Sequence, residues 1–279
     1  MKHIILSFFT VLGVFTSESI FSQDVNRFSS DENKFFIGFQ LSGAFPVESF
    51  TNLNIGSPCN SSINTGSVYE LTLGYRINAH LGGALLLSEA PYELDPASVG
   101  AAQLISGHPG LYQSAAVFKS GQLIAQSAMI GAFYDLPISK NGKIFLKPKL
   151  LLGIIGCTIP EIEVVGQHSP GASDKSGNSI DTVETWDMPK IYAYSISYRI
   201  EAAMYYALNK RFDVFVNLAF QGSSLSFANV PFTYNLTVNS TNNNAGTSTA
   251  LTNNSYVKEI NPSVSYQAII VGLGCEIRF

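Results

Sequence analysis

Charged residues interrupt the apolar stretches of this chain, and they are the first candidates for chemistry. Ten of them fall on strand-like alternating stretches: Glu70, Arg76, Glu89, Lys147, Lys149, Arg199, Glu201, Asp213, Glu276 and Arg278. The set contains five acids and five bases, so each charge has an opposite charge available. Paired charges with further hydrogen bonds offset part of the cost of leaving water. We therefore expect these side chains to form a charge network, provided that the fold turns them into one interior.

Catalytic motifs are absent from the sequence. There is no Walker loop, no dinucleotide-binding glycine motif, no zinc-protease histidine pair and no serine elbow. His108 and His168, in long connections, are the candidates for a general base at a loop rim, and His80 stands in a short turn. The stretch "ISGHPG" around His108 has the composition of a turn. We expect solvated loop histidines and no enzymatic activity.

Acidic residues gather in the connection from Thr158 to Lys190. They are Glu161, Glu163, Asp174, Asp181, Glu184 and Asp187, against Lys175 and Lys190. Carboxylates of this kind could bind a divalent cation, but the spacing is not that of an EF-hand loop. We expect a solvated acidic loop with no metal and no other cofactor. Trp186, the single tryptophan, either anchors this loop at a membrane surface or packs it down.

The three cysteines do not have the spacing of a zinc site. Cys59 and Cys157 fall in or beside polar connections and could form a disulfide in an oxidising compartment. The alternative is that the cysteines serve as small apolar residues.

Composition and the first residues indicate an exported protein with little charged surface. Charged residues make up 13% of the 279 residues, against about 25% in soluble proteins. The net charge of −4 and the lack of a basic patch argue against a nucleic-acid partner. A basic start, the apolar run Ile4–Phe15 and the small Ser22 predict a signal peptide over residues 1–22. Residues 23–33 would then form a short periplasmic segment.

Alternation with a period of two dominates the chain from residue 34 onward and predicts β-strands. In "YAYSISYRIEAAMYYA" one face is apolar from Tyr192 to Tyr206, and the other carries Arg199 and Glu201. Pro148 lacks an N–H group and predicts a local defect in its strand. Eight runs follow the rule with varying clarity: 34–45, 68–77, 81–89, 121–136, 144–155, 192–207, 212–221 and 265–279.

The connections between these runs alternate in length. The short ones are 78–80, 137–143 and 208–211, and the long ones are 46–66, 90–120, 158–190 and 225–264. The fourth long connection is a low-complexity tract rich in Asn and Thr. Short periplasmic turns, long external loops and an even strand number are typical of an outer-membrane barrel. The fold predicted for residues 34–279 is therefore all-β, an eight-stranded antiparallel transmembrane β-barrel.

Aromatic residues near the two ends of the runs predict two girdles at the lipid headgroups. The girdle at the short turns would contain Phe35, Tyr75, Phe133, Tyr134, Phe145, Tyr205, Tyr206, Phe212 and Phe279. The girdle at the long loops would contain Phe45, Tyr69, Tyr192, Tyr194, Phe220 and Tyr266. The apolar faces would meet lipid, and the ten charges would fill a lumen too narrow for a wide aqueous pore.

The signal peptide, the alternating strands, the hairpin "SYRIEAAMYYALNKRFDVFVNLAF" and the final Phe279 resemble the small outer-membrane β-barrel domain family. That family includes the OmpA transmembrane domain and the OmpX-type and PorT-like barrels of Gram-negative bacteria. The resemblance implies that the strand ending in Cys275, Ile277 and Phe279 is the signal read by the barrel-insertion machinery. It also implies contact with outer-membrane lipid and lipopolysaccharide, and with periplasmic chaperones during assembly.

Three functions remain open at this stage. The leading hypothesis is a non-enzymatic barrel with a filled lumen, acting as an envelope component or on a ligand through its external loops. The second is a narrow porin-like or efflux-type channel, and the third is a rim enzyme that modifies lipids or cleaves proteins. Pairing of the lumen charges would favour the first hypothesis over the second, because an open path would leave these charges lining water.

Overall fold

The computed structural model describes residues 34–47, 50, 52–53, 59, 61–96, 112–139, 142–168, 179–242 and 247–279. The predicted signal peptide (1–22), the predicted segment 23–33, and His108, Asp174 and Lys175 lie outside these residues. Every extended element in the described part is a β-strand. No described helix is long and apolar enough to cross a membrane.

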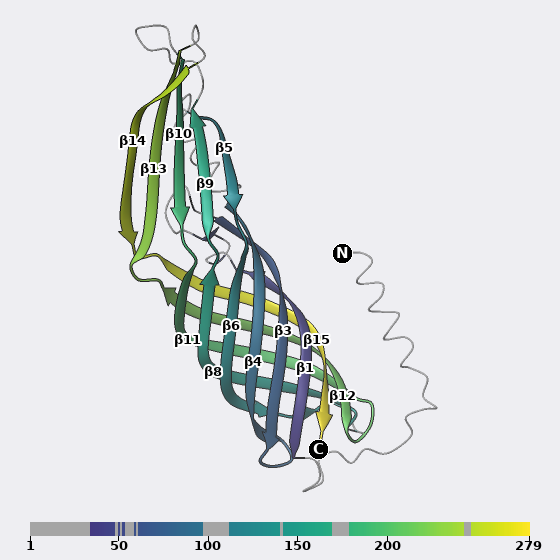
Figure 1. Ribbon diagram of the computed structural model, residues 1–279. Helices are drawn as coiled ribbons and strands as arrows, with labels where there is room; N and C mark the ends of the chain where they lie inside the picture. Colours follow the sequence, from purple (N-terminus) through teal and green to yellow (C-terminus); the bar gives the residue numbers. More distant parts are fainter. Residues whose placement is uncertain are drawn as a thin grey trace.

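Eight strands form a closed antiparallel barrel (Figure 1). They are β1 (Phe35–Pro46), β3 (Ser61–Arg76), β4 (Leu81–Asp95), β6 (Gln122–Tyr134), β8 (Ile144–Ile159), β11 (Ile191–Ala207), β12 (Phe212–Ser226) and β15 (Ser263–Arg278). Each strand pairs with its neighbour in sequence, and β1 pairs with both β3 and β15, which closes the sheet. Closure leaves no free strand edge in the barrel, as a sheet in lipid requires.

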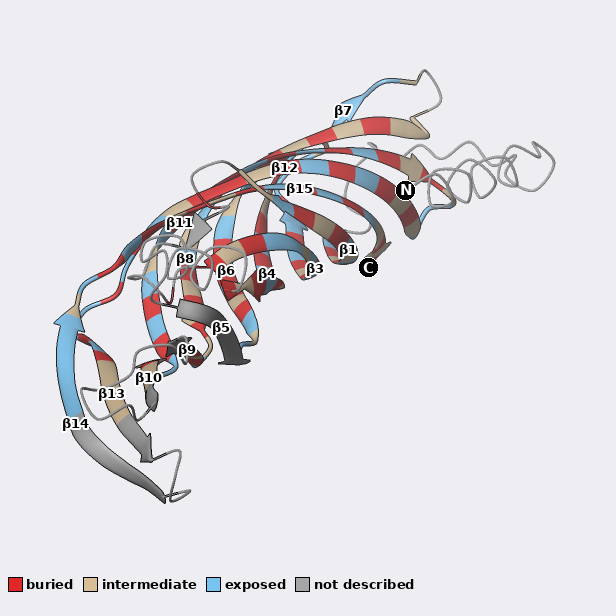
Figure 2. Ribbon diagram, turned by 90° about the horizontal axis from the view of Figure 1, so that it is seen from above, coloured by how far each residue is buried: buried red, intermediate tan, exposed pale blue. Residues whose placement is uncertain are grey.

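Alternation of side chains produces the two faces of the barrel wall. Buried and exposed residues alternate along the strands in Figure 2. On β11 the predicted facing is confirmed, with Tyr194 and Ile200 exposed and Arg199 and Glu201 buried. Because successive side chains of a strand point to opposite faces, one placed residue fixes the facing of the whole run. β6, whose facing was ambiguous in the sequence, buries Met129 and exposes its neighbours.

Short turns connect the strands at one end, here called the turn end. Asn78 Oδ1 accepts hydrogen bonds from the N–H groups of His80 and Leu81, at 2.9 and 2.8 Å. Asn209 makes the same pattern with Arg211 and Phe212. Asn favours such turns because its side chain replaces a backbone acceptor. Both tight turns are therefore encoded locally.

Pro148 interrupts one ladder, as predicted. The β6–β8 pairing runs to Phe133↔Lys149 and resumes with β7 (Leu136–Pro137) at Leu136↔Leu146. The register is unchanged across this gap. Proline cannot donate a ladder hydrogen bond, which explains the break at its position.

The other end of the barrel, here called the sheet end, continues into a second sheet (Figure 1). This outer sheet has the strand order β14-β13-β10-β9-β5. Its strands are β5 (Tyr112–Lys119), β9 (Ile162–His168), β10 (Ser179–Met188), β13 (Val230–Asn242) and β14 (Thr247–Ile260). A two-residue strand, β2 (Asn52–Leu53), pairs with the start of β3 at Asn52↔Ser62.

Three of the four long connections therefore contain β-strands, which the alternation of residues in the sequence did not predict. The Asn- and Thr-rich tract forms the hairpin of β13 and β14 instead of an irregular segment. Polar β-branched threonine suits a half-buried pleated surface once a partner strand is present. The sequence did not predict that β13 and β14 would pair, because neither of them shows the fully apolar face that marks a strand by alternation.

Candidate functional site

Six charged side chains meet inside the barrel near the turn end. They are Arg76, Asp135, Lys147, Asp213, Glu276 and Arg278, all buried. Lys147 Nζ donates to Glu276 Oε2 at 2.6 Å, and Arg76 Nε donates to Asp135 Oδ2 at 2.9 Å. Arg278 Nη2 lies 2.6 Å from Asp213 Oδ2, and its Nε lies 3.3 Å from Glu276 Oε1. This turn-end charge layer brings together side chains from several strands and one turn.

A second layer lies farther into the barrel and contains Glu70, Lys149, Arg199 and Glu201. The guanidinium of Arg199 binds both carboxylates, with Nη2 at 3.0 Å from Glu70 and at 2.6 Å from Glu201. Lys149 Nζ donates to the other oxygen of Glu201 at 2.8 Å. Gln40 Nε2 also donates to Glu70. We call this group the central charge layer.

Nine of the ten predicted network residues lie in these two layers, and Glu89 does not. Asp135 takes its place and restores the balance of five acids and five bases. Glu89 is exposed, and its carboxylate accepts a hydrogen bond of 2.8 Å from Gln126. The run around Glu89 is apolar on both faces, so the sequence could not fix its facing. Asp135 was missed because its run was ambiguous in the same way, although it is in phase with Met129 and Phe133.

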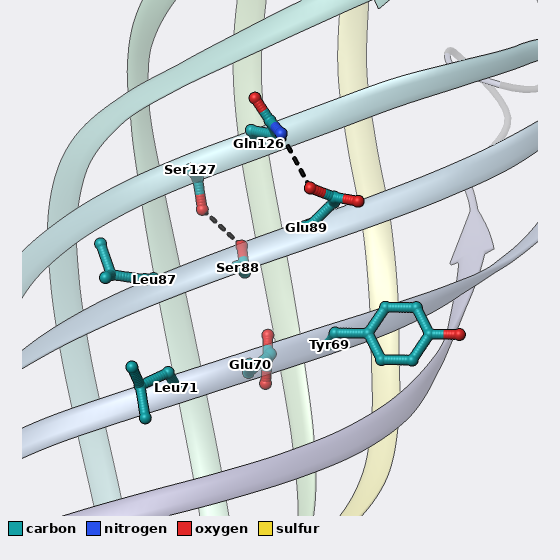
Figure 3. A pocket seen from close by; sticks show the side chains of 8 residues that line it. All are labelled: Tyr69, Glu70, Leu71, Leu87, Ser88, Glu89, Gln126 and Ser127. Carbon is teal, nitrogen blue, oxygen red and sulfur yellow. Dashed lines mark hydrogen bonds between the residues drawn. The ribbon is translucent and has the colours of Figure 1, made fainter.

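Glu89 lies at a shallow depression in the wall formed by β3, β4 and β6, with a volume of about 390 Å³ (Figure 3). It is lined by Tyr69, Glu70, Leu71, Leu87, Ser88, Glu89, Gln126 and Ser127. Ser88 and Ser127 join by a hydrogen bond of 2.6 Å between their hydroxyls. Two pairs of polar groups of the depression thus bind each other, Ser88 with Ser127 and Gln126 with Glu89, while Glu70 binds Arg199 of the central charge layer.

Aromatic rings surround the turn-end charge layer. Lys147 Nζ lies 4.3 Å from the ring centroids of both Phe36 and Tyr205, and 4.9 Å from that of Phe133. A cation over an aromatic face gains electrostatic attraction, and more so where water is excluded. Tyr205 stacks between Phe145 and Phe215 at centroid distances of 4.8 and 4.5 Å. The charged side chains of this layer are therefore packed against aromatic rings as well as against one another.

Apolar residues fill the lumen on the other side of the central charge layer. Phe50, from the connection after β1, lies 5.3 Å from Tyr92 and 4.7 Å from Tyr266 between ring centroids. The two tyrosine hydroxyls join at 2.9 Å. This buried cluster extends into the base of the outer sheet through Val164, Trp186 and other residues. We call it the apolar plug.

The outer wall of the barrel is apolar on every strand. One exposed example per strand, in barrel order, is Leu41, Leu73, Leu85, Ile130, Leu152, Ile196, Leu218 and Val271. Monomeric soluble proteins rarely expose a continuous apolar surface of this extent. The interior holds the charges instead, which is the inverse of a soluble barrel. A closed β-barrel with this inversion is the form that outer-membrane proteins take. The protein spans an outer membrane.

The two aromatic girdles are partly confirmed. At the turn end Phe35, Tyr75, Tyr134 and Phe279 are exposed, and at the sheet end so are Phe45, Tyr69, Tyr192 and Tyr194. The prediction is wrong for four residues, which point into the barrel instead of toward lipid: Phe133, Phe145, Tyr205 and Tyr266. Each stands in phase with inward residues of its strand, so strand facing decides its position whatever its distance from the turn.

The terminal strand agrees with its predicted pattern. Cys275, Ile277 and Phe279 follow the outward phase, while Glu276 and Arg278 are buried. Phe279 is 61% exposed, and its N–H donates to the carbonyl of Phe35 at 2.9 Å. The last residue thus binds the first barrel strand at the seam.

The acidic connection forms part of the outer sheet. Lys119 Nζ lies 2.7 Å from Glu161 and 3.4 Å from Glu163, so these carboxylates are paired with a cation. Burial, and then the nearby charges of Glu161 and Glu163, raise the pKa of Asp187. No group of three or more metal-ligand side chains occurs among the described residues. Trp186 is 8% exposed and packs on Tyr234, so it packs the connection down.

Among the residues that the structure describes, no histidine is placed beside groups that would form a catalytic site. His108 lies outside the described residues, and for His168 only the backbone, at the end of β9, is described. His80 Nδ1 lies 2.9 Å from the carbonyl oxygen of Asp135, and its ring stacks on Tyr134. Its contacts hold the turn against the neighbouring strand.

The candidate disulfide between Cys59 and Cys157 is not formed. All three cysteines are free thiols, and Cys59 and Cys157 are buried in the apolar plug. They pack as small apolar side chains, which was the alternative left open by the sequence. Burial, and then the nearby charge of Asp187, raise the pKa of Cys59 to about 12.

No protein-family model and no curated protein sequence matches the chain. Among solved structures, Neisserial surface protein A is 13% identical, with a TM-score of 0.38, over 90% of this chain and 100% of that chain. OprG from Pseudomonas aeruginosa is 12% identical, with a TM-score of 0.38, over 90% and 99%. A major outer membrane protein from Thermus thermophilus is 11% identical, with a TM-score of 0.38, over 88% and 99%.

Proposed function

We propose that this protein is a non-conducting, non-enzymatic outer-membrane barrel that presents its outer sheet outside the cell. In this proposal the barrel anchors the sheet, and the sheet acts as a binding or structural component of the envelope. The resemblance to OmpA-, OmpX- and PorT-type barrels belongs to the proposal. So do contacts with lipopolysaccharide and with the insertion machinery and chaperones.

The filled lumen is the observation that supports this function. Ten charges pair within two layers, and the buried residues of the apolar plug lie between the central charge layer and the outer sheet. A narrow channel would need an open path lined by solvated groups. The described lumen offers ion pairs such as Lys147–Glu276 and Lys149–Glu201 at hydrogen-bond distance instead. An eight-stranded barrel has an interior that side chains can fill completely.

Single-channel conductance of the full-length protein in planar bilayers tests the closed lumen. We expect no conductance steps from the parent protein. The double variant Glu70→Ala with Arg199→Ala removes one ion pair from the central charge layer and leaves Lys149 bound to Glu201. Because the turn-end charge layer and the apolar plug remain, we expect this variant not to conduct either. Steady conductance by the parent, or rapid uptake of small sugars into liposomes, would overturn the proposal in favour of a channel. Heat-modifiable gel migration verifies that both proteins are folded.

A further inference from the structure

Three neighbouring strands change from apolar to polar on their outward faces at the same level. On β4 the next outward residue after Leu87 is Glu89. Tyr69 of β3 and Gln126 of β6 lie directly opposite Glu89. In the next outward row toward the turn end, Leu71 lies opposite Leu87. Tyrosine and polar side chains gather where hydrocarbon meets the headgroups, and the turns are periplasmic, so this row marks the outer-leaflet boundary.

The depression of about 390 Å³ in the barrel wall lies across this boundary (Figure 3). Along β3 and β4, Leu71 and Leu87 line the part nearer the turn end, and Tyr69 and Glu89 line the part nearer the outer sheet. A lipid of the outer leaflet has the same order, with its acyl chains toward the turn end and its headgroup toward the outer sheet. The depression therefore offers apolar and polar contacts at the levels where one lipid needs them.

Glu89 brings a negative charge to this boundary. Its Oε2 accepts a hydrogen bond of 2.8 Å from the neutral amide of Gln126, and no ion pair among the described residues includes it. β3, β4 and β6 together contain a single lysine or arginine, Arg76, which is buried in the turn-end charge layer. These strands therefore supply no base to bind the carboxylate. A cationic ligand would fit it, because hydrogen bonds between charged groups are stronger than those between neutral ones.

We propose that this depression binds phosphatidylethanolamine, with the carboxylate of Glu89 accepting a hydrogen bond from the primary ammonium of the headgroup. Leu71 and Leu87 would contact the first carbons of the acyl chains, and Tyr69 would lie beside the headgroup. The site is on the outer wall, so it goes beyond the proposed function, which concerns the lumen and the outer sheet.

Other lipids match this wall less well. The quaternary ammonium of phosphatidylcholine has the positive charge but no N–H group to donate. An anionic headgroup, such as that of phosphatidylglycerol or a phosphate of lipopolysaccharide, would face Glu89 with no base on these strands to offset the repulsion. A divalent cation held between Glu89 and a phosphate would reverse this preference, so the test includes one.

Native mass spectrometry of the full-length protein, released from detergent micelles, counts the lipids that stay bound. Phosphatidylethanolamine, phosphatidylcholine and phosphatidylglycerol with identical acyl chains are titrated separately, as is lipopolysaccharide, each with EDTA and again with Mg²⁺. We expect the parent protein to retain one phosphatidylethanolamine at a concentration about tenfold lower than either other phospholipid, since a hydrogen bond between charged groups is lost with both. Heat-modifiable gel migration verifies that the barrel is folded.

Variants of one strand separate a specific site from general adhesion of lipid. Glu89→Gln keeps the size of the side chain and should lower retention of phosphatidylethanolamine to that of phosphatidylcholine. Glu89→Lys should retain phosphatidylglycerol better than phosphatidylethanolamine. Glu93→Gln is the matched control, because Glu93 is an exposed carboxylate on the same face of β4, farther from the turn end, and it should behave like the parent.

Three results would overturn the proposal. They are equal retention of the three phospholipids by the parent, unchanged retention of phosphatidylethanolamine by Glu89→Gln, and a preference for phosphatidylglycerol or lipopolysaccharide with or without Mg²⁺. The last result would assign the depression to an anionic lipid. Conductance of the barrel reports on the closed lumen separately, so a failed lipid experiment leaves the proposed function standing.

Discussion

Arg199 shows how single residues make a charged lumen stable. It is fully buried, but its guanidinium binds Glu70 and Glu201, and Glu201 also binds Lys149. Removing one partner of a buried ion pair leaves the other charge uncompensated, which costs far more than the pair contributes. The same reasoning applies to Lys147, which lies between Glu276 and Asp135.

The first prediction concerns Arg199. Arg199→Met should lower the free energy of unfolding by about 3–5 kcal/mol, because Glu70 loses its cation. The double variant Glu70→Gln with Arg199→Met should be less destabilised than the single variant, because it leaves no unpaired charge. Urea unfolding in detergent measures both. Ile200→Val, on the adjacent outward position, is the control and should have little effect. Equal losses in the single and double variants would contradict the ion-pair account.

The second prediction concerns the thiols. In the folded protein Cys59 should resist alkylation by aqueous iodoacetamide at pH 8, because its pKa of about 12 leaves little reactive thiolate. Cys157, buried in the same cluster, should also resist. After denaturation without a reducing agent, both should react fully. Mass spectrometry counts the modified residues, and thiols that appear only after reduction would indicate a disulfide.

At the scale of elements, the outer sheet depends on pairing between connections that are distant in sequence. β9 and β10 pair antiparallel, and β10 also pairs with β13 from the next connection. Asp187 on β10 lies opposite Glu163 on β9. The sheet therefore holds like charges side by side, offset by Lys119 at its edge.

The third prediction follows from that arrangement. The pKa of Asp187 is raised in the folded protein, so folding favours its protonated form. Its contribution to stability is present at low pH and is lost as the pH rises through the raised pKa. Hydrogen exchange of β9 and β10 amides, corrected for intrinsic rates, should show less protection above that pH. Asp187→Asn should remove this dependence, and Glu259→Gln, an exposed carboxylate on β14, should not.

At the scale of the whole molecule, closure of the barrel depends on the seam between its first and last strands. β1 and β15 are paired from Phe36↔Arg278 to Pro46↔Ala268. Phe279 adds a hydrogen bond to Phe35 at the end of this seam and places its ring in the turn-end girdle. The last residue can therefore affect assembly as well as stability.

The fourth prediction is that deleting Phe279 impairs membrane assembly. The yield of heat-modifiable barrel in the outer-membrane fraction should fall several-fold. A deletion of residues 243–246, which connect β13 and β14 in the sequence, is the control and should assemble normally. Normal insertion of the Phe279 deletion would argue against a role of this residue as an assembly signal.

The eight strands, their facing where polar and apolar residues alternate, and the location in an outer membrane could all be predicted from the sequence. The alternation of apolar and polar side chains can be read within a single strand. On β11 and β15 one face is apolar and the other carries charges, so only the apolar face can point outward. Lipid then requires the apolar face outside, so most of the charge network could be named in advance. Pro148 and the short turns were equally readable, because their effects arise within a few residues.

Features that depend on partners distant in sequence could not be predicted, because they are set by the closed barrel and its outer sheet. The runs of β4 and β6 are apolar on both faces, so only their neighbours in the barrel placed Glu89 outside and Asp135 inside. The rings of Phe133, Phe145 and Tyr205 turned inward because they follow strand phase. The outer sheet forms because hairpins from separate connections align above one closed barrel, and that alignment is set by barrel closure.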